Sequence, residues 1–139
     1  MTQRDDTLAR AQKALQANDF ASGLALVEPL LEEDGADGDA LYMAAVAARY
    51  LKHFDEAERH LAALHTAMPE YGRAWQEAGH LARARGKVAD AIAAYGRATR
   101  FNPALEASWR ALADLEQSAG RSTEAQAALA QAERIARLP

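Results

Sequence analysis

The chain has 139 residues, of which 50% are hydrophobic and 26% are charged, with a formal net charge of −4. This length fits one domain over residues 1–139, and the apolar content excludes a disordered or collagen-like chain. The absence of cysteine excludes disulfides, thiolate metal sites and thiol nucleophiles, and the acidic balance argues against nucleic acid as a partner.

The N-terminal stretch MTQRDDTL is polar and has no apolar run of the length that a signal peptide needs. No later segment approaches the roughly 20 apolar residues that a membrane-spanning helix requires. We therefore expect a cytoplasmic protein with no membrane partner.

A repeat with a constant period runs through the chain and divides it into four units, at about 4–37, 38–71, 72–105 and 106–139. The matching positions are Trp75 and Trp109; Gly86 and Gly120; Pro69 and Pro103; Ala57, Ala91 and Ala125; and Val27, Leu61, Tyr95 and Leu129. A period of about 34 residues is typical of stacked structural units that cannot bury their apolar faces alone.

The first two units match the repeat less well than the later ones. The first has Thr7 where later units have tryptophan, and Pro29 lies within its second predicted helix. Proline removes a backbone donor, so we expect that helix to be kinked or shortened. The second unit keeps Ala57 and Pro69 but has Leu41 at the tryptophan position.

The third unit shows most clearly why each unit should be a helical hairpin. Two apolar stripes at helical spacing are separated by Gly86: Trp75, Ala78, Gly79 and Ala82, then Ala91, Ile92, Tyr95, Ala98 and Thr99. Glycine favours the backbone just past a helix end, and Asn102-Pro103 ends the second helix. We expect Gly79 and Ala91 to face each other, with Trp75 and Tyr95 at the wider ends of that contact.

The fourth unit keeps Trp109, Gly120 and Ala125 but has Arg137 at the proline position. The chain stops at Pro139, directly after the last predicted helix. We expect Leu129, Ile135 and Leu138 to lie near an uncovered surface. This predicts a fragment of a longer protein, with self-association through the C-terminal end as the alternative.

Together these residues resemble the tetratricopeptide repeat, whose pattern of Trp, Leu-Gly, Tyr, Ala, Phe and Pro extends over about 34 residues. The resemblance covers roughly residues 4–137. It implies an all-α fold, an α-solenoid of about four helix-turn-helix repeats with right-handed superhelical stacking. It also implies a single domain whose first helices line a concave groove.

No catalytic constellation is recognisable in the sequence. The few serines lie outside any Gly-x-Ser-x-Gly motif, and no phosphate loop or dinucleotide motif occurs. The four histidines, His53, His60, His65 and His80, form no pair with the spacing of zinc ligands. We therefore expect a noncatalytic chain with no metal and no cofactor.

The resemblance instead implies a partner-binding groove, and the family's ligand-facing positions fall on identifiable residues. They include Tyr42, Met43, Val46, Arg49 and Tyr50 in the second unit, Arg73, Gln76, His80 and Arg83 in the third, and Arg110 in the fourth. Arginine pairs with carboxylates, while tyrosine and methionine supply apolar contact area. We expect a peptide or protein partner that carries acidic and apolar residues.

Two other functions fit the sequence. The region from Asn102 to Pro139 resembles the repeats that precede a sulfotransferase domain in some bacterial proteins, which implies an N-terminal accessory region of a larger enzyme. The other is a structural module that self-assembles through its uncapped end.

Overall fold

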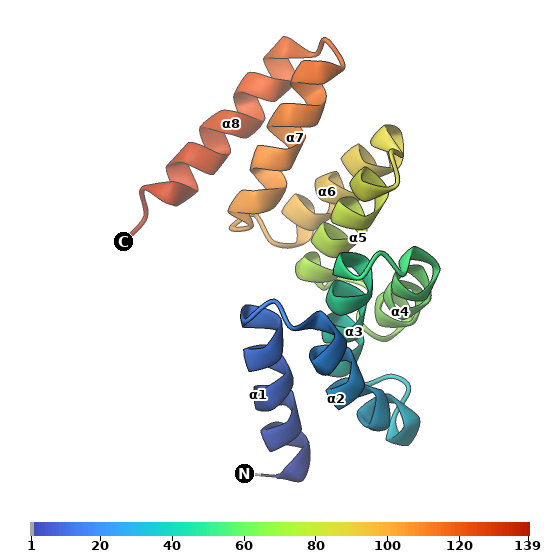
Figure 1. Cartoon of the computed structure of the whole chain (residues 1–139). Coiled ribbons are helices and arrows are strands. Elements are labelled where there is room, and N and C mark those ends of the chain that lie inside the picture. Colours follow the sequence, from blue (N-terminus) through green and yellow to red (C-terminus); the bar gives the residue numbers. More distant parts are fainter. Residues whose placement is uncertain (1) are drawn as a thin grey trace. The chain divides into compact units, whose positions relative to one another are not determined.

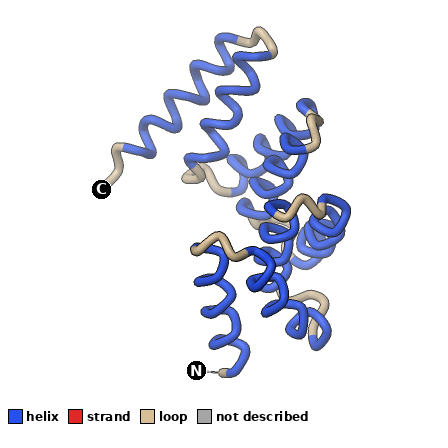
Figure 2. The backbone as a smooth tube through the Cα atoms, viewed as in Figure 1, coloured by secondary structure: helices blue, strands red, loops and turns tan. Residues whose placement is uncertain are grey.

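A computed structural model describes residues 2–139, and over this range the chain forms eight α-helices and no strand (Figures 1 and 2). The helices are α1 (Gln3–Gln16), α2 (Phe20–Glu33), α3 (Gly38–Tyr50), α4 (Phe54–Ala67), α5 (Gly72–Ala84), α6 (Val88–Phe101), α7 (Glu106–Ser118) and α8 (Ser122–Ala136). Consecutive pairs form four helical hairpins. None of these helices is both long enough and apolar enough to cross a membrane.

The turn inside every hairpin uses the same backbone conformation. Gly86 and Gly120, predicted to end α5 and α7, have φ angles of 74° and 79°. Asn18 and Lys52 have φ angles of 61° and 64° at the equivalent places in the first two hairpins. These four positions are each one repeat apart, so the repeat fixes the backbone geometry even where glycine is absent.

Pro29 does not shorten its helix, and the expected kink stays a prediction. Helix α2 runs from Phe20 to Glu33 and has 14 residues, as do α4 and α6. Pro29 is exposed and lies inside this helix, where its missing N–H leaves the Ala25 carbonyl without the usual helical hydrogen bond. The packing of α2 on the core holds the helix together across this gap.

The residues fall into two compact units, the first ending at Pro69 and the second beginning at Glu70. Each unit contains two hairpins and its own apolar core. The core of the first unit is built from Ala11, Leu24, Val27, Leu30, Ala40, Ala44 and Ala47. The core of the second contains Ala91, Tyr95, Ala111, Leu112, Ala113, Leu115 and Ala128. In both units the first helix of the later hairpin, α3 or α7, packs into the hairpin before it.

Small residues let these helices approach closely. Gly79 lies against the ring of Tyr95, because a Cβ atom built on Gly79 would stand 2.7 Å from the ring carbons. The pairing of Gly79 with Ala91 stays a prediction. Tyr95 is fully buried. The glycine therefore makes room for an aromatic ring at the centre of the α5–α6 contact.

Candidate functional site

In the second unit, polar side chains join the first helices of the two hairpins. The Ser108 hydroxyl of α7 donates to Oε1 of Gln76 on α5 at 2.8 Å. Ser108 is fully buried, so this hydrogen bond satisfies a hydroxyl that water does not reach. An ion pair of 3.5 Å between Arg83 and Asp114 joins the same two helices. The predicted residues Gln76 and Arg83 thus share one α5–α7 face.

A buried residue, Tyr95, fixes the position of His80 on this face. Its Nδ1 atom lies 2.6 Å from the phenol oxygen of the buried Tyr95, and the two rings meet edge to face. Because Tyr95 cannot move without disturbing the core, the contact fixes the orientation of the half-buried imidazole. Tyr95, which the sequence predicts as a packing residue, thus also positions the candidate binding residue His80.

The arginines of this unit differ in their surroundings. Arg73 and Arg83 are exposed on α5, while Arg110 is exposed on α7 and pairs with Glu106 of its own helix at 2.9 Å. Glu77, which neighbours Gln76 on α5, is only 2% exposed. The charge that α5 presents to solvent is therefore more positive than the sequence pattern indicates.

In the first unit, the candidate residues lie on α3. Tyr50 is 53% exposed and stacks on Phe20 of α2, with ring centroids 4.3 Å apart and planes within 4°. The Arg49 guanidinium lies 4.3 Å from the centre of the Tyr50 ring. Sequence analysis missed Phe20, because it lies far from Tyr50 in the sequence and belongs to a second helix.

The other α3 candidates are less accessible. Met43 packs against the core of the first unit, as do Leu8 and Leu15 of α1. Tyr42 and Val46 are half-buried. The apolar candidates on α3 are therefore mostly half-buried residues at the edge of the core, and Tyr50 is the most exposed of them.

An ion-pair cluster at the start of α3 was not predicted. Nε and Nη2 of Arg4 each lie 2.8 Å from a different oxygen of Asp37, and Nη2 also lies 3.0 Å from Asp39. The Asp37 side chain is 5% exposed and also caps α3 by accepting the Ala40 N–H. The hydrogen bonds from Arg4 lower the pKa of the Asp37 carboxyl. A pairing between side chains so distant in the sequence carries no local sequence signal.

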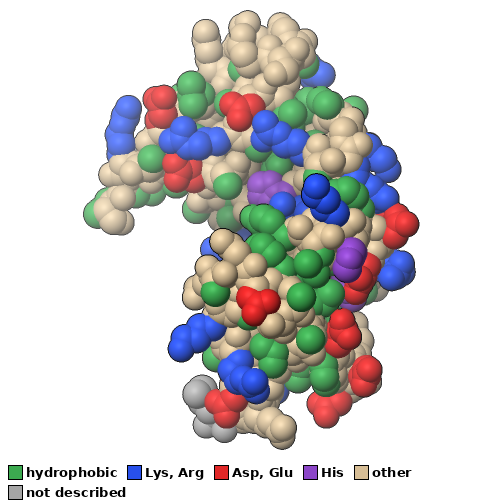
Figure 3. Space-filling view, in the orientation of Figure 1, with side chains coloured by type: hydrophobic (Ala, Val, Ile, Leu, Met, Phe, Trp, Pro, Cys, Tyr) green, Lys and Arg blue, Asp and Glu red, His purple; other side chains and the backbone are tan. Residues whose placement is uncertain are grey.

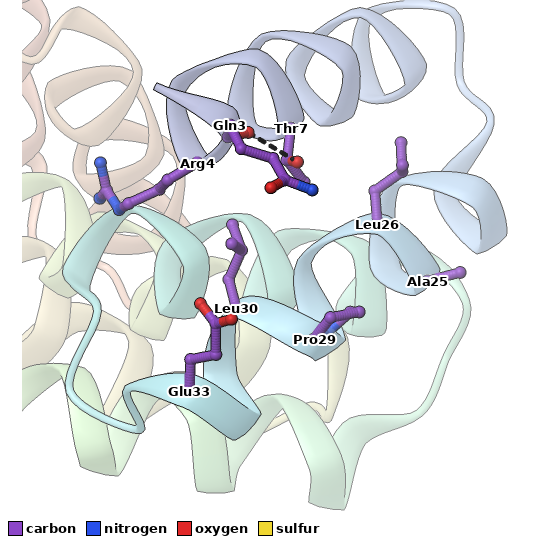
Figure 4. A pocket seen from close by; sticks show the side chains of 8 residues that line it. All are labelled: Gln3, Arg4, Thr7, Ala25, Leu26, Pro29, Leu30 and Glu33. Carbon is purple, nitrogen blue, oxygen red and sulfur yellow. Dashed lines mark hydrogen bonds between the residues drawn. The ribbon is translucent and has the colours of Figure 1, made fainter. Parts of the chain in front are cut away.

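A cleft of about 320 Å³ opens between α1 and α2 (Figure 4). Its α2 wall combines the apolar residues Leu26, Pro29 and Leu30 with the carboxylate of Glu33, whereas α1 contributes the polar side chains of Gln3, Arg4 and Thr7. The Thr7 hydroxyl donates to the Gln3 carbonyl at 3.0 Å, within α1. Arg4 is already engaged by Asp37, so the charge that this cleft offers to a ligand is mainly that of the exposed Glu33 carboxylate.

The predicted site residues divide between the two units. Tyr42, Met43, Val46, Arg49 and Tyr50 share α3, while Arg73, Gln76, His80 and Arg83 share α5 and Arg110 lies on α7. A continuous groove that contains all ten stays a prediction. On the face shown in Figure 3, basic and acidic side chains are interspersed, without a field of one sign. Residues 2–139 contain no cluster of three side chains suited to hold a metal ion.

Solved structures share this arrangement of helices. A crystal structure of MamA superposes with a TM-score of 0.82 and 15% identity, covering 94% of this chain and 77% of that one. MamA residues 41 to the end from Desulfovibrio magneticus RS-1 give a TM-score of 0.80 and 15% identity, covering 96% and 75%. A thermophilic tetratricopeptide repeat protein in Thermus thermophilus gives 0.80 and 20% identity, covering 94% and 73%.

The chain has the tetratricopeptide repeat fold. This confirms the all-α class and the helical hairpins that the repeat period predicts. No protein-family model and no curated protein sequence matches the chain. Identities this low show a shared fold but not a shared ligand, so binding depends on this chain's own residues.

Proposed function

We propose that this chain is a noncatalytic protein-interaction module whose first helices bind a segment of a partner protein. The observation that carries the proposal is the α5–α7 face. Gln76 and Arg83 are held there by side chains of α7, and His80 is held by Tyr95. Side chains fixed in this way lose little conformational entropy on binding, which favours recognition of a partner.

The charge of this face favours an acidic partner segment. Arg73, Arg83 and Arg110 are all exposed, and Glu77 is buried. Asp114 and Glu106 pair with Arg83 and Arg110 at the surface, where a partner carboxylate can compete for the guanidinium groups. Guanidinium groups bind carboxylates with paired hydrogen bonds. In the first unit, the exposed ring of Tyr50 offers apolar contact area beside Arg49. Acidic residues of a partner suit the α5–α7 face, and apolar residues suit the face around Tyr50.

The test uses a capped peptide of alternating Glu and Leu residues, with binding measured by calorimetry at several salt concentrations. We expect the variant Arg73→Glu/Arg83→Glu to bind at least about tenfold more weakly, because like charges repel, and to show a flatter salt dependence. The control Arg59→Glu/Arg100→Glu makes the same charge change at exposed positions of α4 and α6. Equal affinity of both variants for the peptide would refute the proposed face.

The cytoplasmic location and the two other functions stay predictions. A sulfotransferase domain encoded downstream of Pro139 would support the accessory-region hypothesis. A molecular mass that rises with concentration in light scattering would support self-assembly, whereas a strict monomer would exclude it.

A further inference from the structure

A crevice between α7 and α8 lies outside the predicted groove residues. Its volume is about 370 Å³, and its lining is mainly apolar. The lining residues are Trp109, Leu112 and Glu116 from α7, and Glu124, Ala127, Ala128 and Gln131 from α8. Two carboxylates and no basic side chain belong to this set. The crevice therefore combines an apolar surface with negatively charged groups on its walls.

The indole of Trp109 is fixed in this crevice. Its Nε1–H donates to the Pro103 carbonyl at 2.8 Å, and the ring packs against the core of the second unit. The hydrogen bond uses the one polar group of the indole, so the ring offers its apolar and π surface to an occupant. The aromatic surface is thus already in place before a ligand arrives.

Glu116 carries negative charge at the wall of this crevice. It is only 8% exposed, and its buried Oε2 accepts no hydrogen bond. Nε of Arg121 stands 3.3 Å from Oε2, so the carboxylate has an ion-pair partner without a well-directed hydrogen bond. Glu124 lies exposed in the first turn of α8. Because Oε2 is buried and faces Arg121, Glu116 contributes negative potential to the wall, and the exposed Glu124 is the more accessible carboxylate.

The preceding hairpin shows what fits such a crevice. There the guanidinium of Arg97 on α6 lies 4.8 Å from the ring centre of Trp75 on α5. The repeat period places Gln131 of α8 at the position of Arg97, and Trp109 at the position of Trp75. The chain thus covers one of its two tryptophans with its own arginine and has a shorter, neutral side chain at the second.

We propose that the α7–α8 crevice binds an arginine side chain of a partner polypeptide, with the guanidinium over Trp109 and its charge attracted by the carboxylates of Glu116 and Glu124. The planar guanidinium suits this site better than an ammonium, because it stacks on an indole and also donates to carboxylates. This site does not depend on the α5–α7 face, and the two prefer ligands of opposite charge.

The test uses the Trp75→Phe chain, in which Trp109 is the only indole, and a capped peptide of alternating Leu and Arg residues. Peptide binding should shift the Trp109 fluorescence in a saturable manner. A peptide with citrulline in place of arginine has a similar shape but no charge, and it should bind at least about tenfold more weakly. Equal affinities for the two peptides would overturn the proposal.

The decisive variant is Gln131→Arg, which restores the arginine of the preceding hairpin. Its guanidinium should cover Trp109 within the chain and weaken binding of the arginine peptide at least about tenfold. Gln126→Arg adds the same charge at an exposed α8 position outside the crevice lining and should change the affinity less than twofold. Both variants are surface changes, so circular dichroism should show intact helices. Equal affinities of the two variants would overturn the proposal.

Discussion

Gly79 shows how a single residue sets the approach of two helices. A side chain there would collide with the ring of Tyr95, whereas a Cβ atom built on Gly96, inside α6, meets nothing within 4 Å. We expect Gly79→Ala to lower the free energy of unfolding by about 1–3 kcal/mol through overpacking. Gly96→Ala should raise it by about 0.5–1 kcal/mol, because alanine has the higher helix propensity. Urea unfolding of both variants tests this, and similar effects would contradict the packing account.

At the same scale, Asp37 links stability to pH. Because Arg4 lowers the pKa of the Asp37 carboxyl, the folded state favours the charged form. This contribution is complete above the ordinary carboxyl pKa and is lost as the pH falls through the lowered value, below about pH 4.

Asp37→Asn keeps a residue that caps helices well but removes the charge. The variant should be less stable than the native chain at pH 7, and the difference should shrink toward pH 3. Asp39→Asn, at a side chain that is 67% exposed, should have a smaller effect. Thermal unfolding from pH 7 to pH 3 measures both, and a constant difference for Asp37→Asn would exclude the ion pair as its cause.

At the scale of the elements, the helix ends distinguish the four hairpins. Lys52 adopts the left-handed conformation that Gly86 and Gly120 adopt more easily. Lys52→Gly should therefore raise the free energy of unfolding by about 0.5–1 kcal/mol, and Gly86→Ala should lower it by about 1 kcal/mol. Lys52→Ala controls for loss of the lysine side chain and should give no gain. A stabilisation by Lys52→Ala equal to that by Lys52→Gly would refute the backbone explanation.

The helices show which features a sequence can predict. Gly86, Gly120 and Asn102-Pro103 act through their own backbone, so helix ends follow from local chemistry. Lysine does not favour the left-handed conformation, so the conformation of Lys52 follows only from its position in the repeat, equivalent to Gly86 and Gly120. The contacts of Arg4 with Asp37 and of Phe20 with Tyr50 join residues that are distant in the sequence. They depend on how hairpins pack, which no local pattern specifies.

For the whole molecule, each unit has its own core, so the second unit should fold alone. A chain of residues 70–139 should have a helical circular dichroism spectrum and a cooperative thermal transition. Its stability should be below that of the full chain, because repeat proteins gain stability from neighbouring units. A gradual transition without cooperativity would contradict an independent second unit.

The central claim is that the acidic and apolar partner segment contacts the first helices α3 and α5 rather than the second helices α4 and α6. A photo-crosslinking amino acid placed singly at Tyr42, Gln76, Arg59 or Arg100 tests it directly in the presence of the peptide of alternating Glu and Leu residues. The account predicts partner adducts from positions 42 and 76 on α3 and α5, and none from positions 59 and 100 on α4 and α6. Adducts mainly from positions 59 and 100 would contradict it.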